Sequence, residues 1–494
     1  MKTSLFSVIA SVLLLFICSA GAPVSQVYQF NYENVLGTSF ELKVVASSGQ
    51  LASTAERVAL AEIDRLNSIL STYDPTSEVS RWQKTLNREV SISPELFEVL
   101  TLFDQWNVKT GGVLNASAEI AFALWKKASI NQVLPTADEL AHAASAMNRP
   151  HWKLNTVQHT ATHLSTDPLV LNSFVKSYII SKVSEKIMLL PGVTGAVINI
   201  GGDIMVTGIQ QERIRVSDPV ADAENDKPLA ILKINNKAIA TSGNYRRGFK
   251  IGEQWYSHIL DVRTAFPTTD IISATVVAEH ATDAGALATA FNILSPEESA
   301  VLAKQISGVE YQIITKAGQE IVSTGWKALE ETSTEVTKPL GSRANGEYEM
   351  TIELELARFE GRFRRPFVAV WVEDKKKESV RNLAVWYNKS RWLPDLKRWY
   401  TKNQPGKMDP AVMESISSAT RSAGKYTLTW DGLDEQGKPV PSGKYTIYIE
   451  AAREHGTYQL LKQEVEWNGK PKHVDLTGGI EITSASLDYH KVKN

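Results

Sequence analysis

Two adjacent glycines and an acid follow an apolar stretch in the first half of the sequence. Residues 196–200 have the composition of a buried strand, and Gly201, Gly202 and Asp203 come directly after them. Glycines let another group approach the backbone closely, and the carboxylate would lie beside that group, so the pattern suits a ligand site. It suits a tight hairpin between two strands equally well. The segment alone leaves both interpretations open.

A histidine follows a polar loop later in the chain. Residues 240–248 are largely polar, and His258 comes shortly after them, ahead of a pair formed by Asp261 and Arg263. Because a histidine titrates near neutral pH, His258 could move a proton or contact a phosphate. A single histidine beside a strand is also a common structural residue. A third polar segment, residues 71–81, follows an apolar helix end and by itself predicts only a helix terminus.

Alternating helix and strand patterns would position these segments. Apolar residues at helical spacing predict helices over residues 51–70, 94–109, 118–127 and 136–147. Strand-like patterns cover residues 40–45, 196–200, 230–234 and 272–278. We therefore predict an α+β domain over residues 23–328. A linker is predicted at 329–346, where Glu, Thr, Ser, Lys, Pro and Gly replace the periodic pattern.

Short strands separated by turn residues characterise residues 347–494. The composition and spacing predict an all-β sandwich whose tryptophans are core residues. Two basic runs, 362–365 and 375–377, are expected in a solvated loop or along an exposed strand edge. The predicted strands are rich in Thr, Tyr, Val, Ile and Trp and cover residues 348–356, 367–372, 383–386, 425–430 and 444–451.

The N-terminus has the pattern of a secretory signal peptide, which we assign to residues 1–22. A lysine precedes an apolar run at 5–17, and small residues follow it. The run is too short for a membrane span. Cys18 could carry a lipid, although the bulky Ile17 before it disfavours this, and membrane association is expected only in that case. We therefore expect an exported, periplasmic protein.

Cysteine content and net charge exclude several kinds of site and partner. Cys18 is the single cysteine of the sequence, so a chain that has lost residues 1–22 would hold no disulfide, thiolate metal site or cysteine nucleophile. The formal net charge is −2. This balance argues against a nucleic-acid partner, because phosphate binding needs a clear basic excess.

In their order along the chain, these segments resemble the motifs of the FAD:protein FMN transferase (ApbE) family. The resemblance covers about residues 27–326. It implies an enzyme that splits the FAD pyrophosphate, moves FMN onto a Thr or Ser hydroxyl of an exported flavin-acceptor protein, and releases AMP. The matching motifs are Leu-Ser-Thr-Tyr at 70–73, Asn-Ile-Gly-Gly-Asp at 199–203, Thr-Ser-Gly-Asn-Tyr at 241–245, Ser-His-Ile-Leu-Asp at 257–261 and Ala-Gly-Ala-Leu-Ala-Thr-Ala at 284–290.

The resemblance also implies which residues form the site. His258 and Lys176 would be catalytic, through proton transfer and contact with the phosphates. A bound Mg²⁺ ion would neutralise charge on the phosphate oxygens. The residues that would line FAD are Leu36, Tyr73, Val113, Leu114, Asn115, Lys176 and His258, and those that would surround Mg²⁺ are Ser173, Ala288 and Thr289.

The metal-binding helix departs from the family pattern at Gly285. This residue stands where the family has a metal-binding aspartate, four residues before Thr289 on the same helical face. Asp283 lies about 200° around the helix from Gly285, so it would need a local rearrangement to replace that carboxylate. The resemblance therefore predicts a damaged magnesium site.

Further departures lie around the flavin loop and after the histidine. Val170, Ser173 and Ser177 replace an acid and two glycines of the family, and Ala265 replaces another glycine. Three interpretations stay open: a transferase with a weakened metal site, a catalytically impaired flavin-binding or partner-binding protein, and a structural accessory module. Substituting Gly285→Asp is the simplest test of whether the missing carboxylate limits activity.

The C-terminal half has its own resemblance. Residues 347–494 are similar to an uncharacterised exported bacterial domain found with flavin-transfer and membrane redox proteins. The stretch from Trp430 to Tyr445 is also similar to the immunoglobulin-like domain of flagellar hook-capping proteins. We therefore expect an immunoglobulin-like sandwich here, without catalytic residues.

Overall fold

A computed structural model describes most of the chain after its N-terminal segment. The predicted signal peptide with Cys18, and most of the linker predicted at 329–346, lie outside the described residues. No helix within the described part combines the length and the apolar composition that crossing a bilayer requires. The described residues are 25–220, 223, 228–244, 247–331, 347–387, 390–403, 417–418, 420–454 and 456–492.

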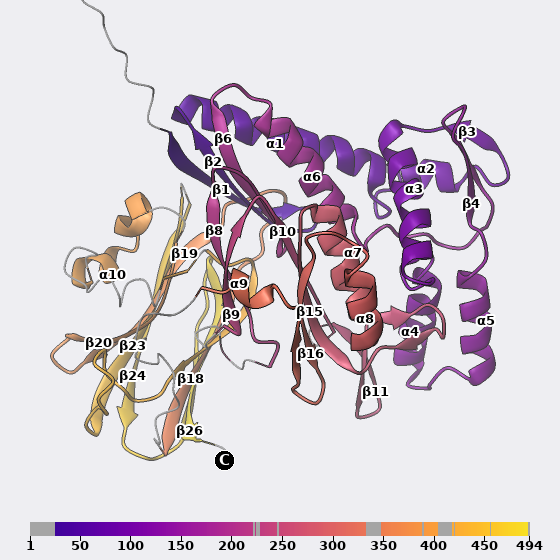
Figure 1. The fold of residues 1–494 in the computed structure, drawn as a ribbon. Helices are drawn as coiled ribbons and strands as arrows, with labels where there is room; N and C mark the ends of the chain where they lie inside the picture. Colours follow the sequence, from indigo (N-terminus) through magenta and orange to yellow (C-terminus); the bar gives the residue numbers. More distant parts are fainter. Residues whose placement is uncertain are drawn as a thin grey trace, which may run out of the picture.

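An antiparallel sheet of eight strands forms the centre of the N-terminal part (Figure 1). The strands predicted at 40–45, 196–200 and 272–278 lie within it, and the strand predicted at 230–234 belongs to a separate hairpin. These predictions are confirmed. In spatial order the strands are β1 (Gln26–Val35), β2 (Thr38–Ala46), β6 (Val193–Ile200), β7 (Asp203–Gly208), β10 (Ala238–Gly243), β15 (Ile271–Ala278), β16 (Glu310–Thr315) and β17 (Glu320–Val322).

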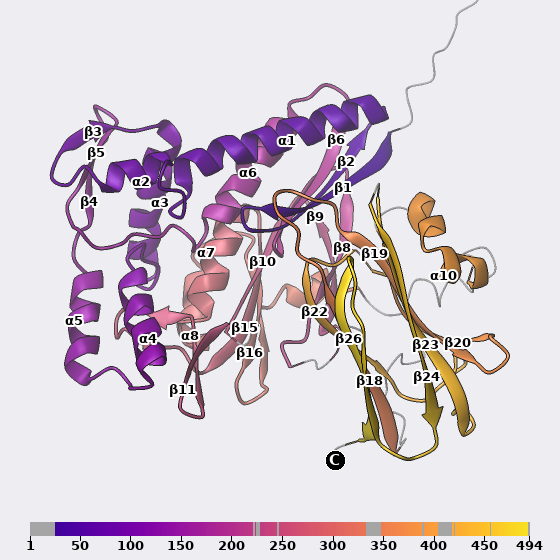
Figure 2. The same ribbon diagram turned by 180° about the vertical axis from the view of Figure 1, so that it is seen from behind.

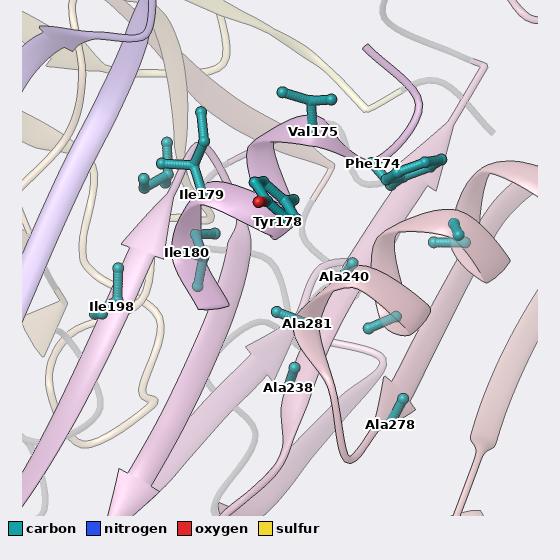
Figure 3. Packing of buried hydrophobic residues seen from close by; sticks show 14 of the residues in the cluster. Phe174, Val175, Tyr178, Ile179, Ile180, Ile198, Ala238, Ala240, Ala278 and Ala281 are labelled. Carbon is teal, nitrogen blue, oxygen red and sulfur yellow. The ribbon is translucent and has the colours of Figure 1, made fainter. Parts of the chain in front are cut away.

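Three long helices cover one face of this sheet, and a hairpin covers the other (Figure 2). Figure 3 shows Ile179 and Ile180 of helix α6 (Val175–Met188) beside Ile198 of the sheet, with Ala238 and Ala281 nearby. Small residues at such positions let helices approach the strands closely. The elements are α1 (Gly49–Leu70), α6 (Val175–Met188), α7 (Ala281–Phe291) and the following α8 (Pro296–Ala303), then the hairpin β8 (Gln211–Val216) and β9 (Ala230–Asn235) with α9 (Trp326–Leu329).

A second group of helices, with several small sheets, extends from the end of α1 (Figure 2). Local sequence sets where these helices begin: Ser93 caps the helix that Pro94 opens, and Thr136 and Glu139 form a capping box. The helices predicted here are confirmed. The elements are α2 (Glu78–Gln83), α3 (Pro94–Lys109), α4 (Glu119–Asn131), α5 (Ala137–Met147), β3 (Glu89–Ser91), β4 (Trp152–Asn155), β5 (Thr160–His163), β11 (Gly248–Ile251), β12 (Gln254–Ser257), β13 (Leu260–Asp261) and β14 (Phe266–Pro267).

Two sheets that share one apolar core make up most of the C-terminal part, so the all-β prediction is confirmed. Trp386 and Trp430 are buried in that core, as expected. Two short helices cover an outer face, where Trp371 and Trp399 are buried. The first sheet contains β22 (Gly424–Trp430), β18 (Tyr348–Leu356), β26 (Ile482–Lys491) and β25 (Lys472–Leu476); the second contains β21 (Ser417–Ser418), β20 (Ser379–Trp386), β19 (Pro366–Asp374), β23 (Gly443–Arg453) and β24 (Tyr458–Trp467); the helices are η1 (Ser390–Asp395) and α10 (Lys397–Lys402).

The first basic run lies between the two parts of the molecule, in residues 359–365, which we call the docking segment. The amide of Glu33 in β1 donates a hydrogen bond of 2.7 Å to the carbonyl of Phe363. The guanidinium of Arg365 pairs with the carboxylate of Glu33, and these residues are only 8% and 5% exposed. The expectation of a solvated run at 362–365 is therefore wrong for Arg365, which is buried against Glu33, and holds for Arg362, which is exposed.

The other two arginines of the docking segment also contact the N-terminal part. Arg362 lies 2.7 Å from the carboxylate of Asp64 on α1. Arg364 lies over the ring of Tyr32 and donates to its hydroxyl at 3.2 Å. Burial and a hydrogen bond to Glu56 raise the pKa of Tyr32 to about 12, so this phenol stays protonated. The second basic run, 375–377, is exposed as expected.

Replacing Arg365 by Met should lower the free energy of unfolding by about 3–5 kcal/mol, because it leaves the carboxylate of Glu33 buried without its partner. The double variant Glu33→Leu/Arg365→Met should recover most of this loss. Arg362→Met removes a more exposed ion pair and should cost less than about 1 kcal/mol. Urea unfolding of the three variants checks this. A loss for Arg365→Met no larger than that for Arg362→Met would contradict it.

Candidate functional site

The carboxylate of Asp203 binds two residues in the first turn of α6. The ammonium of Lys176 lies 3.3 Å from Oδ1, and the hydroxyl of Ser177 donates to Oδ2 at 2.7 Å. Ser177 is fully buried, whereas the side chain of Lys176 is 34% exposed. The lysine therefore presents part of its charge to solvent at the N-terminal end of a helix, a place that favours anions.

The paired glycines form the tight hairpin that the sequence allowed. Gly201 and Gly202 both have positive φ angles, +58° and +98°, and they join β6 directly to β7. The side chain of Asn199 accepts a hydrogen bond of 3.0 Å from the amide of Gly202. Left-handed conformations at both central residues favour glycine. The hairpin also places Asp203 beside α6, so the two interpretations of this segment describe one arrangement.

The position of the missing carboxylate is filled by another side chain. A Cβ atom on Gly285 would lie 2.2 Å from Oγ and 2.9 Å from Cβ of Ser177. Atoms cannot approach this closely without a shift of α6 or α7. In the family pattern this pair is glycine in α6 and aspartate in α7, and here the larger residue is on α6. The two departures noted in the sequence therefore lie in direct contact across the α6–α7 interface.

Three neutral oxygens meet next to this contact. The hydroxyl of Thr289 lies 3.1 Å from the carbonyl of Ser173 and 3.1 Å from the carbonyl of Gly285. This spacing resembles the ~3 Å that separates neighbouring oxygens around an octahedral Mg²⁺. Ala288, the third predicted metal residue, is buried in the core.

The three oxygens around Thr289 are all uncharged, which is unfavourable for a magnesium site. Magnesium sites in proteins normally include a carboxylate. The carboxylate of Asp203 is held by Lys176 and Ser177. Asp283 lies six residues before Thr289, about 9 Å along the helix, and burial raises its pKa. Among the described residues, no group of three or more His, Cys, Asp or Glu side chains could hold a metal. The donor set therefore does not fit the Mg²⁺ ion that the resemblance implies.

The residues predicted to line FAD differ widely in exposure. Tyr73 is 76% exposed, and its hydroxyl accepts a hydrogen bond from Asn172, just before α6. Leu36 is half-buried in the turn between β1 and β2, with a φ angle of +52°. Val113 and Leu114 are each only 1% exposed and belong to the core. Tyr73 thus presents its ring to solvent near α6. The side chains of Val113 and Leu114 do not reach solvent.

Asn115 uses its side chain to hold a loop. Its amide nitrogen donates to the carbonyl of Met147 at 2.9 Å, and its oxygen accepts from the amide and hydroxyl of Ser117. Met147 is the last residue of α5. The Asn115 loop, which is predicted to line FAD, is therefore fixed to the end of this helix.

His258 is held at the end of β12, in the group of small hairpins beside α4. Its Nδ1 lies 3.0 Å from the carbonyl of Arg247. A carbonyl only accepts hydrogen bonds, so Nδ1 carries the proton and Nε2 is left with the lone pair. Burial lowers the pKa of His258, which keeps the ring neutral at pH 7. His258 is thus prepared to accept a proton at Nε2.

The loop after His258 retains a glycine-like backbone without the glycine. Ala265 has a φ angle of +59°, and its carbonyl accepts a hydrogen bond of 2.8 Å from the indole of Trp125. Alanine in this conformation costs about 1 kcal/mol relative to glycine. The hydrogen bond from Trp125 helps to hold Ala265 in this conformation.

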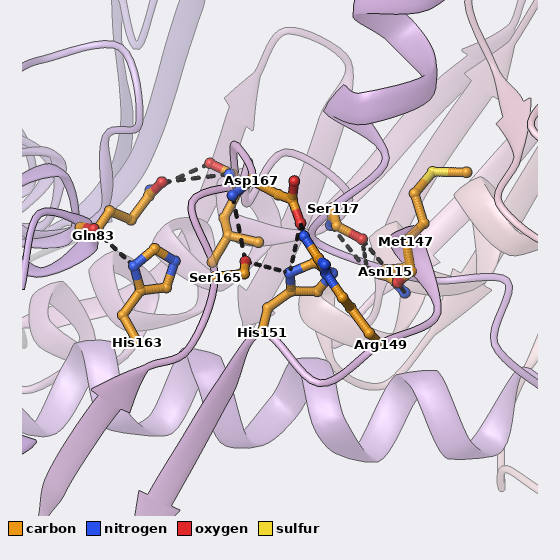
Figure 4. A network of polar contacts seen from close by, with 10 residues as sticks. Gln83, Asn115, Ser117, Met147, Arg149, His151, His163, Ser165 and Asp167 are labelled. Carbon is orange, nitrogen blue, oxygen red and sulfur yellow. Dashed lines mark hydrogen bonds and ion pairs between the residues drawn. The ribbon is translucent and has the colours of Figure 1, made fainter. Parts of the chain in front are cut away.

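Two buried histidines behind the Asn115 loop were not identified from the sequence (Figure 4). Nδ1 of His151 lies 2.7 Å from the hydroxyl of Ser165, and Nδ1 of His163 lies 2.7 Å from the carbonyl of Gln83. Burial lowers the pKa of both rings. Their spacing in the sequence matches no ligand motif, so only the fold shows that they lie close together.

Stability should fall as the pH drops below about 6.5, the ordinary pKa of the two histidines. Below that pH the unfolded chain binds protons that the buried rings exclude, so the unfolded state gains stability. Each ring contributes up to about 1.4 kcal/mol per pH unit. His151→Gln should flatten the dependence of unfolding free energy on pH between 6.5 and 5, and the exposed His142→Gln should not. Equal slopes for both variants would refute this.

Comparison with known proteins places the two halves of the chain separately. Residues 36–313, more than half of the chain, match the family described as the ApbE family. Residues 348–484 match a family described as a predicted periplasmic protein, DUF2271.

Relatives named FAD:protein FMN transferase align with the N-terminal part. The protein from Vibrio cholerae is 28% identical over 310 residues, covering 60% of this chain and 89% of its own length. The protein from Haemophilus influenzae is 27% identical over 316 residues, covering 60% and 90%.

Solved structures share the fold. The ApbE protein of Thermotoga maritima superimposes with a TM-score of 0.55 at 23% identity, over 62% of this chain and all of its own. The flavinyl transferase ApbE of Pseudomonas stutzeri gives a TM-score of 0.51 at 21% identity, over 62% of this chain and 97% of its own. At these identities the likeness concerns the fold alone.

Proposed function

The chain belongs to the ApbE family, and from this premise we propose that it is an exported FAD:protein FMN transferase. It would move FMN from FAD onto a Thr or Ser hydroxyl of an exported redox partner. The names of the aligned relatives support this activity. The description of the C-terminal family supports export, and residues 1–22 would be the signal peptide.

The observation that carries the proposal is the meeting of distant segments at the start of α6. Tyr73 reaches Asn172, Thr289 reaches Ser173, and Asp203 holds Lys176. A helix N-terminus with a partly exposed lysine is suited to the FAD pyrophosphate. Tyr73 would cover the flavin or adenine ring.

The chemistry that follows is a substitution at phosphorus. The acceptor hydroxyl oxygen forms a bond to the phosphorus of the FMN half, the bond from that phosphorus to the bridging oxygen breaks, and AMP leaves with that oxygen. Lys176 would neutralise charge on the phosphates. His258 would take the hydroxyl proton at Nε2, which its hydrogen bond to Arg247 leaves free to accept. The described donors do not fit Mg²⁺, so Lys176 and the N-terminus of α6 would carry the stabilisation of the phosphates.

The second candidate is a catalytically impaired flavin-binding or partner-binding protein. The exchange of Ser177 and Gly285 favours it, because it removes a carboxylate and fills the vacated space. In this case the phosphates would lack a metal ion and FAD would bind without being cleaved. The C-terminal part, proposed as an immunoglobulin-like sandwich over 347–494 after a linker at 329–346, would then serve partner recognition.

Incubation of the purified protein with FAD and an exported flavin-acceptor domain separates the candidates. A transferase should give covalent flavin on the acceptor, seen by in-gel fluorescence, and an equal amount of AMP. His258→Asn should lower the rate by about 100-fold, the lower end of the contribution of a general base. FAD binding without AMP release would point to the catalytically impaired flavin-binding protein. Absence of FAD binding would point to the third interpretation, a structural accessory module.

The contact between Ser177 and Gly285 makes Gly285→Asp insufficient by itself as a repair. Alone, it should destabilise the protein by about 1–3 kcal/mol through overpacking against Ser177. The double variant Ser177→Gly/Gly285→Asp should relieve the clash and create a carboxylate near Thr289. Thermal unfolding measures the first effect and calorimetric titration with Mg²⁺ the second. Mg²⁺ binding by Gly285→Asp alone, at wild-type stability, would show that the clash is unimportant.

A further inference from the structure

The docking segment fixes an irregular point in the first strand of the N-terminal sheet. Between Tyr32 and Val35, β1 has one residue more than β2, so the strand bulges at Glu33 and Asn34. Asn34 adopts a left-handed conformation with φ +58°. Such an extra residue loses its regular pairing with the neighbouring strand and needs other partners.

Those partners come from the C-terminal part. The side-chain nitrogen of Asn34 donates to the carbonyls of Phe359 and Gly361 at 3.0 and 2.7 Å. Glu33 contributes the backbone hydrogen bond to Phe363 and the buried ion pair with Arg365. The bulge is therefore held from outside its own sheet.

The bulge leads directly into the flavin side of the N-terminal part. Leu36 and Gly37, with φ angles of +52° and +71°, form the turn that follows it. The next strand contacts the glycine hairpin: the amide of Gly201 donates to the carbonyl of Ser39 at 3.0 Å. A Cβ on Gly201 would lie 2.7 Å from the side chain of Thr38, so the two turns fit tightly.

The path ends at the charged groups of the site. Asp203 follows the glycine hairpin, and its carboxylate positions Lys176. The contacts between the docking segment and Lys176 are hydrogen bonds, a tight contact and an ion pair, and short runs of chain at residues 34–38 and 201–203 connect them. A displacement of the bulge therefore has few ways to relax before it reaches the hairpin.

We propose that the C-terminal part positions the flavin pocket, and that Asn34 is the positioning residue through which it does so. The inference rests on the proposed function, which puts Leu36 and Lys176 at bound FAD. The C-terminal part contributes no group to the reaction. Its docking segment sets the shape of the turn at Leu36 and the hairpin at Gly201, and so sets the affinity for FAD.

Asn34→Gly tests this without disturbing the backbone, because glycine accepts the same φ angle while losing both hydrogen bonds to the docking segment. The matched control is Asn87→Gly. Asn87 is exposed, has a φ angle of +57°, and lies in a turn after α2. The full-length variants are compared by flavin-fluorescence titration, kinetics of AMP release, thermal unfolding and amide hydrogen exchange.

The expected result is a local loosening with weaker FAD binding. In Asn34→Gly the amides of residues 36–40 and of Gly201 should exchange faster, and the Kd and KM for FAD should rise about 3- to 10-fold, the effect of one typical hydrogen bond. The kcat for AMP release should not change. Asn87→Gly should show neither effect, because glycine also suits its φ angle and Asn87 lies in a turn after α2, away from β1.

Two results would overturn the inference. Unchanged exchange and unchanged affinity in Asn34→Gly would show that the docking segment does not position the turn. Faster exchange with unchanged FAD affinity would show that the turn is positioned but does not shape the pocket. Failure of the proposed function is distinct: the wild-type chain would then bind no FAD, whatever the exchange of residues 36–40.

Discussion

The close contact between α6 and α7 is the constraint on which the site depends. Both helices lie on the same face of the central sheet, and they approach so closely that Ser177 and Gly285 cannot both carry a larger side chain. One oxygen atom of Ser177 fills the space and binds Asp203. This contact leaves no room for a side chain at position 285 and ties Asp203, the acid after the glycine hairpin, to α6, where Asp203 also pairs with Lys176. The helix contact decides what chemistry the neighbouring oxygens can support.

The charged and titratable groups that the sequence singled out are each held by a different contact. Asp203 balances Lys176, and His258 is kept neutral by burial and oriented by a backbone carbonyl. The cluster around Thr289 consists of uncharged oxygens. Such a site can hold phosphates through a lysine and a helix N-terminus, but it offers little to a divalent cation. The described site thus offers a place for phosphate groups without offering a carboxylate to a divalent cation.

The junction between the two parts of the molecule shows how tertiary contacts change the meaning of a charge run. Consecutive arginines usually lie in solvent, but Arg365 is buried because Glu33 faces it, and Arg364 lies on the ring of Tyr32. A buried pair of this kind is costly to break and so fixes the register of the docking segment on β1. The C-terminal part is thereby attached to the strand that leads into the turn at Leu36.

The sequence by itself determined the elements and the family, because apolar periodicity, caps and glycine turns are local properties that the chain encodes residue by residue. The helix at 94–109 and the strands at 40–45 and 196–200 lie where they were predicted. The sequence also located Gly285 as a departure. Contacts in the tertiary structure were needed to show that Ser177 fills the space beside it, that Asp203 is already paired, and that Arg365 of the basic run is buried. Those facts depend on contacts between residues distant in the chain, and no local pattern encodes them.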